Sequence, residues 1–494
     1  MAGDRLLKGI PDELQASADR AAKTLLDARH VFVATHIDAD GVAAASIAMS
    51  ALERRGMQAE VGYFKKLDDE AIAGIRKKTL GVAWYTDLGS GSLSKIEGQP
   101  AVVSDHHVLD PHAVIGSMKG QAKLTDFSSV LHVNPQLHGY SGATDLSGAG
   151  STFLVALSMD SRNRDLAPLA VLGAVGDLQD QKTTRLEGLN RSVLELAVSD
   201  GSVDTHQDIR YFGRETRPVQ KLLEYSSDPF LPGITGNEQG ALGFLLELGI
   251  ELKDGERWRT WTELEQAERD EVIEALRQHL TKTRRRPDAA ARLVGEVYVL
   301  AKEEPGTPLR DAKEFATLLN ACGRHGKAEV GMRICRGDRG DILSEGLALL
   351  RDHRSALSQA LGLAKEKGIT RMRNIQYFDA GDEIEDTIIG TVAGMVLNNG
   401  GSDRSAPMVA FAESLEHSDV PKLKASARAT QDLVSRGVDL SAAMRSAAEK
   451  VGGVGGGHNI AAGATIPADR KKDFLSLLDN IVETQILSRA RRRV

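Results

Sequence analysis

The chain of 494 residues is too long for one ordinary hydrophobic core, so we expect two or three domains. An apolar fraction of 41%, a charged fraction of 27%, no bilayer-length apolar run and no signal-peptide pattern together predict a cytoplasmic globular protein without a membrane partner. The net charge of −7 excludes a general polyanion binder, so nucleic acid would have to be attracted by a local basic groove or by bound cations.

The elements predicted in chain order indicate an α/β protein of three parts. Apolar runs at 31–35, 81–86 and 101–104 predict strands, and a helical pattern at 42–55 follows the first of them. The Ala- and Leu-rich run at 166–175 predicts a buried helix. This spacing favours βα units and a mostly parallel sheet in an N-terminal domain, 1–200. The charged stretch 201–300 predicts a helical linker or inserted module, with the basic cluster 284–286 on a solvated face, and 301–494 predicts a second α/β domain.

Each of the four apolar runs is followed by aspartate or histidine. The residues in question are His36, Asp38 and Asp40, then Asp87, then Asp105, His106 and His107, and finally Asp177. Alone, an aspartate after a strand is usually a turn residue or a helix N-cap, and Asp-His-His would fit a surface loop. However, the carboxyl ends of parallel strands meet at one edge of a sheet, where ligands gather. We therefore expect these side chains to converge.

A cluster of this kind is typical of a metal site. The carboxylates of Asp38, Asp40, Asp87 and Asp177 would repel one another in one pocket and raise each other's pKa, and two divalent cations would balance them. Imidazole and carboxylate ligands without thiolate favour Mn²⁺ or Mg²⁺ and are also compatible with zinc. Cys322 and Cys335 form no CxxC pair, so a thiolate site is not expected. Two such cations can activate water and neutralise a phosphate, which predicts a metal-dependent phosphodiesterase.

The sequence also resembles a known group. HIDADG at 36–41, the aspartate of YTDLG at 85–89, SDHH at 104–107 and GAVGDLQD at 173–180 resemble the four motifs of the DHH phosphoesterase superfamily, which includes RecJ exonucleases, family II pyrophosphatases and the replication factor Cdc45. ASARAT at 425–430 and GGGHNIAAG at 455–463 resemble the arginine-bearing and glycine-rich motifs of the DHHA1 domain. FGRETRP at 212–218 and KEFATLLNACGR at 313–324 are similar to archaeal RecJ-like proteins, especially GINS-associated nuclease.

This resemblance implies roles for individual residues. One metal would be held by His36, Asp38 and Asp87, and a second by Asp40, Asp87, His106 and Asp177, so that Asp87 bridges them. Asp105 would orient an imidazole and His107 would lie near the scissile phosphate, which makes Asp87, Asp105 and His107 the expected catalytic residues. The expected substrate-binding residues are Arg428, whose planar fork suits a phosphate, with Gly455, Gly456, Gly457 and His458, although a glycine-rich stretch alone would fit a flexible connector.

The implied protein has an N-terminal DHH domain, a helical insert and a C-terminal DHHA1 domain, with the active site in the cleft between domains. The implied activity is a single-strand-specific exonuclease on DNA or RNA, with 5′-to-3′ polarity, acting in DNA replication and repair with the GINS complex and the replicative helicase. Two alternatives stay open. One is a small-molecule or oligonucleotide phosphodiesterase with the same metal centre, and the other is a Cdc45-like replisome scaffold with weak or no nuclease activity. The complete set of ligand residues speaks against the scaffold.

Overall fold

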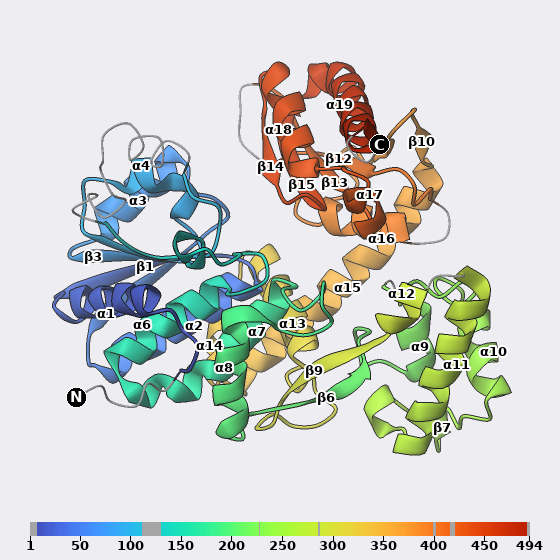
Figure 1. Cartoon of the computed structure of the whole chain (residues 1–494), viewed down its shortest axis with the longest axis horizontal. Coiled ribbons are helices and arrows are strands. Elements are labelled where there is room, and N and C mark those ends of the chain that lie inside the picture. Colours follow the sequence, from blue (N-terminus) through green and yellow to red (C-terminus); the bar gives the residue numbers. More distant parts are fainter. Residues whose placement is uncertain are drawn as a thin grey trace. The chain divides into compact units, whose positions relative to one another are not determined.

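The chain forms two compact units, each assembled from two stretches of sequence. A computed structural model describes residues 7–110, 130–226, 228–284, 287–398, 402–414 and 420–491. The first unit contains Met1–Leu222 with Ile250–Leu350, and the second contains Leu223–Gly249 with Arg351–Val494. The division falls inside helix α15 (Asp341–Lys367). Both units combine helices with a sheet, which confirms the predicted α/β class (Figure 1). The predicted boundaries at 200 and 300 and the predicted cleft location stay predictions.

The first unit is built on a five-stranded sheet in which all strands are parallel, in the order β2-β1-β3-β4-β5. The predicted strands at 31–35, 81–86 and 101–104 are confirmed as β1, β3 and β4. β1 lies between β2 and β3, so the direction of the strand order reverses beside it, where α/β proteins place ligands. The strands are β1 (His30–His36), β2 (Gln58–Phe64), β3 (Val82–Thr86), β4 (Ala101–Ser104) and β5 (Val130–Val133).

Both faces of this sheet are covered, which explains why its central strands read as continuous apolar runs. Val31, Val33 and Trp84 point into the larger core, and Phe32 and Tyr85 into the smaller one. The helix predicted at 166–175 is confirmed as α7, and it is apolar on all sides because it lies inside the larger core. Helices of the larger core include α1 (Asp12–Leu26), α2 (Ala39–Arg54), α6 (Gly148–Met159), α7 (Ala167–Gly176), α8 (Gly188–Ser199), α13 (Ala312–Arg324) and α14 (Ala328–Cys335), whereas α3 (Asp69–Lys78) and α4 (Leu93–Ile96) cover the other face.

A pair of antiparallel strands brackets the predicted insert. β6 (Val203–Ile209) pairs with β9 (Val294–Leu300), so the two ends of the intervening segment meet. These strands were not predicted, because their pairing depends on residues about 90 positions apart in the chain. Between them lie α9 (Val219–Glu224), α10 (Glu238–Glu247), β7 (Lys253–Asp254), β8 (Arg257–Trp258), α11 (Gln266–Arg284) and α12 (Pro287–Ala291). Arg285 and Arg286 of the predicted basic cluster lie outside the described residues.

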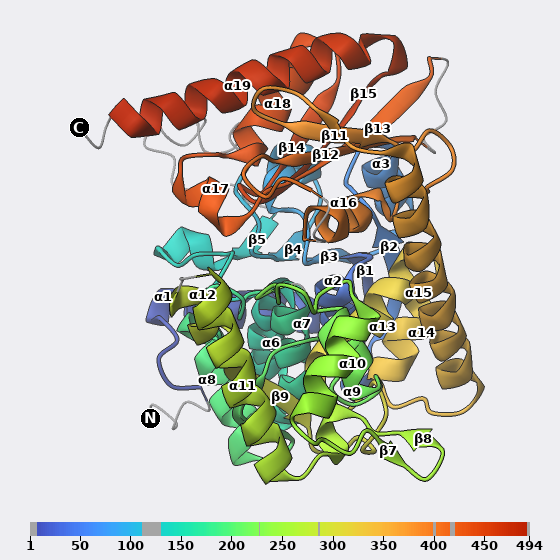
Figure 2. The same ribbon diagram turned by 90° about the vertical axis from the view of Figure 1, so that its right-hand side faces the viewer.

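The second unit contains a six-stranded mixed sheet in the order β10-β11-β12-β13-β15-β14. Helix α16 (Ile389–Asn398) packs on one face, and α17 (Gln431–Ser435), α18 (Leu440–Lys450) and α19 (Lys471–Arg491) lie on the other (Figure 2). No helix among the described residues is long and apolar enough to span a bilayer. The strands are β10 (Thr370–Arg371), β11 (Gln376–Asp379), β12 (Met408–Glu413), β13 (Lys422–Arg428), β14 (Val454–Gly457) and β15 (Ala461–Pro467).

Candidate metal centre

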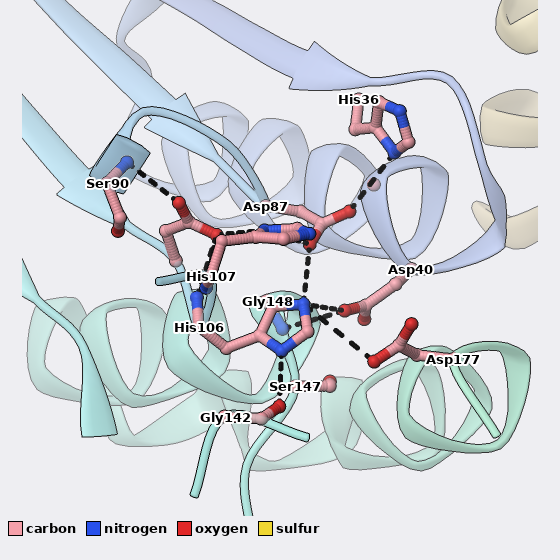
Figure 3. A network of polar contacts seen from close by, with 12 residues as sticks. His36, Asp40, Asp87, Ser90, His106, His107, Gly142, Ser147, Gly148 and Asp177 are labelled. Carbon is pink, nitrogen blue, oxygen red and sulfur yellow. Dashed lines mark hydrogen bonds and ion pairs between the residues drawn. The ribbon is translucent and has the colours of Figure 1, made fainter. Parts of the chain in front are cut away.

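The histidines and aspartates that follow β1, β3, β4 and α7 converge at one edge of the parallel sheet (Figure 3). Their ligand atoms form three groups whose members lie within 4.8 Å of one another. The groups are His36, Asp38 and Asp87; Asp40, His106 and Asp177; and Asp87, Asp105, His106 and His107. The structure thus brings together all eight residues that the sequence placed at this edge. Asp38 is at the same time the N-cap of α2 and accepts a hydrogen bond from the Gly41 N–H at 3.0 Å.

Asp87 lies between the first two groups. Its Oδ2 is 3.7 Å from His36 Nδ1, which in turn lies 2.8 Å from Asp38 Oδ2. Its Oδ1 is 3.2 Å from His106 Nε2 on the other side. One carboxylate therefore presents one oxygen to each group, which is the arrangement of a bridging ligand.

The Asp87 carboxylate is buried beside three histidines and other carboxylates. The residue is 1% exposed, and neither oxygen accepts a hydrogen bond within the described part of the chain. Burial, with the negative charges of Asp40 and Asp38, raises the pKa of Asp87 well above its usual range. A buried carboxylate that accepts no hydrogen bond is costly, and bound cations would satisfy it. The backbone of Asp87 has φ 57°, a left-handed conformation often found at functional sites.

His106 has the orientation that a metal ligand requires. Its Nδ1 lies 2.5 Å from the carbonyl oxygen of Gly142, so Nδ1–H donates there and Nε2 is the nitrogen that faces the carboxylates. Nε2 is 3.7 Å from Asp40 Oδ2 and 3.8 Å from Asp177 Oδ2. Although burial lowers the pKa of His106, Asp177 and Asp40 outweigh it and raise this pKa to about 9. The position therefore attracts a cation, and a divalent ion fits the donor set better than a proton.

Asp40 combines a metal-facing position with contacts to a helix N-terminus. Its oxygens accept hydrogen bonds from the backbone N–H groups of Gly148, at 2.7 Å, and Ala149, at 3.0 Å, in the first turn of α6. The N-terminus of a helix stabilises a negative charge. Burial nevertheless raises the pKa of Asp40 to about 6, with the nearby Asp177 charge adding to the shift. Negative charge thus remains in excess on this side as well.

Asp105 does not take part in this excess, because donors surround it. Its carboxylate accepts from the backbone N–H groups of Ser90, at 2.8 Å, and His106, at 2.7 Å, and lies 2.8 Å from His107 Nδ1. Burial acts to raise the pKa of Asp105, but the neighbouring His107 outweighs it and the pKa is lowered. The imidazole that Asp105 orients is therefore that of His107. The His107 side chain is 42% exposed, as a substrate-facing group would be.

Comparison with known proteins agrees with this site. Residues 211–294 match the DHH-CID domain and residues 373–484 match the DHHA1 domain. The chain therefore contains DHH-CID and DHHA1 domains. It is 27% identical over 464 residues to the uncharacterized protein MJ0831 of Methanocaldococcus jannaschii, covering 92% of this chain and 94% of that relative.

Solved structures share the fold of this DHH/DHHA1 chain at low sequence identity. RecJ from Thermus thermophilus in complex with Mn²⁺ has a TM-score of 0.57 at 16% identity, and the match covers 97% of this chain but only 56% of RecJ. An exonuclease RecJ bound to manganese has a TM-score of 0.54 at 16% identity, with coverage of 97% and 96%. CDC45 from Entamoeba histolytica has a TM-score of 0.60 at 10% identity, with coverage of 96% and 98%. The fold is thus common to nucleases and to CDC45.

Two glycines beside the DHH site were not predicted. A Cβ on Gly148 would lie 2.4 Å from Asp87 Oδ1 and 2.7 Å from the Asp87 Cα, and a Cβ on Gly173 would lie 2.2 Å from Asp40 Oδ1. Both glycines lie in helices, α6 and α7, where sequence alone gives no reason for them. They allow the two helices to approach the buried carboxylates.

Gly148→Ala is expected to displace Asp87 and to lower the cleavage rate about 100-fold, because shifts near 1 Å at a reacting centre have effects of this size. Overpacking should also lower the free energy of unfolding by about 1–3 kcal/mol. Turnover and urea denaturation measure both effects. Gly74→Ala is the matched control, since Gly74 lies within helix α3 with no described atom near its Cβ position. It should stabilise the protein by about 0.5–1 kcal/mol and leave turnover unchanged. Equal turnover in both variants would contradict this role of Gly148.

Three further polar residues near the site were not assigned a role from sequence. The Gln179 amide donates to Asp177 Oδ2 at 3.1 Å and to the Gly142 carbonyl at 2.9 Å, and Asn190 donates to Gln179 Oε1 at 2.6 Å. Arg324, at the end of α13, lies close enough to Asp38 for their charges to interact, and burial lowers its pKa. The position of Gln179 two residues after Asp177 is a usable signal, whereas Asn190 is recognisable only in three dimensions.

The predicted substrate-binding residues belong to the DHHA1 domain, in the second unit. Arg428 ends β13, and its guanidinium lies over α16, since a Cβ on Gly390 would be 2.6 Å from Nη2. Gly455, Gly456 and Gly457 form most of strand β14 and are not a flexible connector. Glycine is required there because a Cβ on Gly455 would lie 2.6 Å from the Met444 carbonyl oxygen in α18. The His458 N–H donates to the Ala461 carbonyl at 2.8 Å and closes the β14–β15 turn.

Proposed function

We propose that this DHH/DHHA1 protein is a two-metal nuclease that removes nucleotides from single-stranded DNA or RNA, with 5′-to-3′ polarity. The observation that carries the proposal is Asp87, a buried carboxylate without a donor whose two oxygens face two separate groups of ligands. Such a centre suits hydrolysis of a phosphodiester, whose negative charge repels hydroxide. The exonuclease RecJ structures with the same fold contain manganese, which supports Mn²⁺ as the ion, with Mg²⁺ as the alternative.

In this proposal His36, Asp38 and Asp87 hold one cation, and Asp40, Asp87, His106 and Asp177 hold the other. When bound, such a pair lowers the pKa of water and neutralises the charge of the phosphate. The protein fixes the ligands before substrate arrives. The Gly142 carbonyl orients His106, the Gln179 amide orients Asp177, and the first turn of α6 orients Asp40. These contacts limit the motion of each ligand and so favour one geometry of the centre.

Three positively charged or protonatable groups would hold the substrate. His107 is oriented by Asp105. Burial lowers the pKa of His107, but the negative charge of Asp105 and its hydrogen bond to His107 outweigh burial and raise this pKa to about 9. His107 can therefore donate a proton to a phosphate oxygen at neutral pH. Arg324 lies near the acidic centre and can pair with a backbone phosphate. Because the chain has a net charge of −7, attraction of nucleic acid needs such a local positive charge. Arg428 would bind a further phosphate, and the 455–457 segment, on the far side of β15 in the same sheet, would offer backbone N–H groups.

The proposal includes a role in DNA replication and repair as a GINS-associated nuclease in the cytoplasm. It rests on the similarity of 212–218 and 313–324 to archaeal RecJ-like proteins. A Cdc45-like scaffold is the second candidate, favoured by the fold shared with CDC45. Asp87 argues for the nuclease, because a scaffold gains nothing from a buried carboxylate that accepts no hydrogen bond.

The test of the proposed function is digestion of oligonucleotides labelled at either end, as single-stranded DNA, single-stranded RNA and duplex, with Mn²⁺, Mg²⁺ or EDTA. We expect shortening of single strands from the 5′ end, only with a divalent cation. Inorganic pyrophosphate and a dinucleotide serve as comparison substrates. No cleavage of any oligonucleotide under conditions where the protein binds Mn²⁺ would refute the nuclease, and preferential hydrolysis of the dinucleotide or pyrophosphate would favour a small-molecule enzyme.

Arg428→Ala is expected to raise KM for a single-stranded oligonucleotide roughly 10–100-fold, since a hydrogen bond to a charged group contributes about 1.5–3 kcal/mol. Affinity for Mn²⁺ should not change, because Arg428 belongs to the second unit and the ligands belong to the first. Steady-state kinetics and Mn²⁺ titration measure the two quantities. Arg445→Ala removes the same charge from an exposed position on α18 and should leave both unchanged. Identical kinetics of the two variants would remove Arg428 from the site.

A further inference from the structure

The segment 210–216, which connects β6 to the insert, contacts the turn that carries Asp177 and the start of helix α13. We call it the clasp segment. It overlaps the FGRETRP stretch, to which the proposed function gives no role. The segment lies where the DHH-CID match begins, at residue 211. Its polar side chains are mostly buried, so their partners in the protein indicate what it does.

The first contact joins Arg210 to the turn that carries Asp177. The Arg210 Nη2 donates to the carbonyl oxygen of Asp180 at 3.0 Å and to the Asp180 carboxylate. The Arg210 side chain is 7% exposed. A Cβ on Gly295 of β9 would lie 2.4 Å from Arg210 Cδ, so glycine is what lets this side chain reach Asp180. Asp180 lies three residues after Asp177, in a turn where Leu178 has φ 59°, a conformation that L residues adopt only when surrounding contacts hold them.

The second contact joins Arg214 and its neighbours to the start of α13. The Arg214 guanidinium, 2% exposed, donates to Asp311 Oδ2 at 3.0 Å and to Asp208 Oδ2 at 2.8 Å. Asp311 is the N-cap of α13. The Glu215 N–H donates to Glu314 Oε1 at 2.8 Å, and the Thr216 hydroxyl donates to the other oxygen of Glu314. The clasp segment therefore fixes the first turn of α13 through two buried carboxylates.

The other end of α13 supports the loop of the first ligand group. The Ala39 N–H, between Asp38 and Asp40, donates to Asn320 Oδ1 at 3.0 Å. A Cβ on Gly323 would lie 1.8 Å from the Ile37 carbonyl oxygen, so the last turn of the helix is in direct contact with this loop. In its middle, α13 also reaches α7, because a Cβ on Gly176 would lie 2.8 Å from Ala39 Cβ and 3.3 Å from Ala316 Cβ. One stiff helix thus connects the clasp segment to the His36–Asp40 loop.

We propose that the clasp segment positions both groups of metal ligands, with Arg210 acting through Asp180 on Asp177, and Arg214 acting through α13 on the His36–Asp40 loop. The inference rests on the proposed metal centre. A ligand site is the alternative interpretation of so many buried charges, but the cavity among Asp180, Arg210 and Arg214 measures about 20 Å³, which is room for one water and not for a nucleotide. Arg210 and Arg214 are positioning residues, since a guanidinium is a permanent cation that cannot bind a metal ion and each acts through another residue.

The test measures Mn²⁺ affinity of the full-length protein by isothermal titration calorimetry, without substrate. Arg210→Met and the milder Asp180→Asn should each weaken Mn²⁺ binding about 10-fold, the lower end of the range for residues that orient ligands. The double variant should also lose about 10-fold, because both changes break one contact. Arg214→Met should weaken binding to a similar extent, and Arg214→Lys should recover part of it. With Mn²⁺ saturating, KM for an oligonucleotide should stay unchanged in all of them.

Arg259→Met is the matched control. It removes the two hydrogen bonds from Arg259 to Glu268 inside the insert, and neither residue belongs to the clasp segment or α13. The side chains of Arg259 and Glu268 are 14% and 23% exposed. The variant's melting temperature should fall while its Mn²⁺ affinity stays that of the wild type. Unchanged Mn²⁺ affinity in Arg210→Met and Asp180→Asn, or a roughly 100-fold loss of affinity in the double variant, would overturn the inference and leave the proposed function standing. A wild-type protein that binds no Mn²⁺ would overturn the proposed function and the inference with it.

Discussion

Asp87→Asn is expected to abolish cleavage and at the same time to stabilise the metal-free protein. The metal pair contributes several kcal/mol to the reaction, and each 1.36 kcal/mol is a factor of ten, so kcat/KM should fall by at least about 1000-fold. Without metal, the wild type keeps a buried carboxylate with no donor. Asparagine removes that charge and tolerates the backbone at φ 57°. The free energy of unfolding of the metal-free protein should therefore rise by about 1–3 kcal/mol.

Turnover and urea denaturation in EDTA measure the two effects of this substitution. Asp69→Asn is the control, because Asp69 is an exposed carboxylate at the start of α3 that pairs with Lys95. It should leave turnover unchanged, and it should change the free energy of unfolding by less than about 0.5 kcal/mol. A loss of activity accompanied by a loss of stability in Asp87→Asn would indicate a structural role for Asp87. Wild-type turnover in this variant would exclude it from the metal centre.

Removal of divalent cations is expected to stop cleavage and to lower the melting temperature of the first unit. A ligand that binds only the folded state at 100 times its Kd stabilises it by about 2.7 kcal/mol, which corresponds to roughly 4 °C in a unit of this size. The crowded carboxylates explain the direction, since burial and mutual repulsion raise the pKa values of Asp87, Asp40 and Asp177 in the metal-free protein. Differential scanning calorimetry across a Mn²⁺ titration measures the shift.

The second unit provides an internal control for that titration. The candidate clusters found among the described residues all lie in the first unit, so a separate transition of the second unit should not move with Mn²⁺. Asp87→Asn should respond less to Mn²⁺ than the wild type. A melting temperature that is the same in EDTA and in excess Mn²⁺ would contradict the metal centre, whatever the activity.

The parts of this fold that are local in sequence could be predicted. His36, Asp87 and Asp105 each come directly at the end of an apolar run, so the strands and the shared edge followed from the pattern alone. The helix before Asp177 was recognisable from its Ala and Leu content. Each aspartate or histidine after an apolar run is a weak signal by itself. The four together were informative because the carboxyl ends of parallel strands lie at one edge of the sheet, and four such segments rarely carry ligand residues by chance.

The parts that depend on tertiary contacts could not be predicted. β14 contains three glycines, which disfavour strands, and the need for Gly455 is visible only when Met444 and Ala448 of α18 are placed against it. The role of Gly148 appears only when Asp87, 61 positions earlier in the chain, is placed against α6. The clasp segment likewise binds Asp180 and Glu314, partners about 30 and 100 positions away. In each case the sequence carries the residue but not the neighbour that requires it.

The most direct test of the paired-metal centre is the anomalous difference density of a crystal soaked in Mn²⁺. The account predicts two peaks on either side of the Asp87 carboxylate, one beside His36 and Asp38 and the other beside Asp40, His106 and Asp177. A single peak, or manganese bound elsewhere while Asp87 stays without a cation, would contradict it.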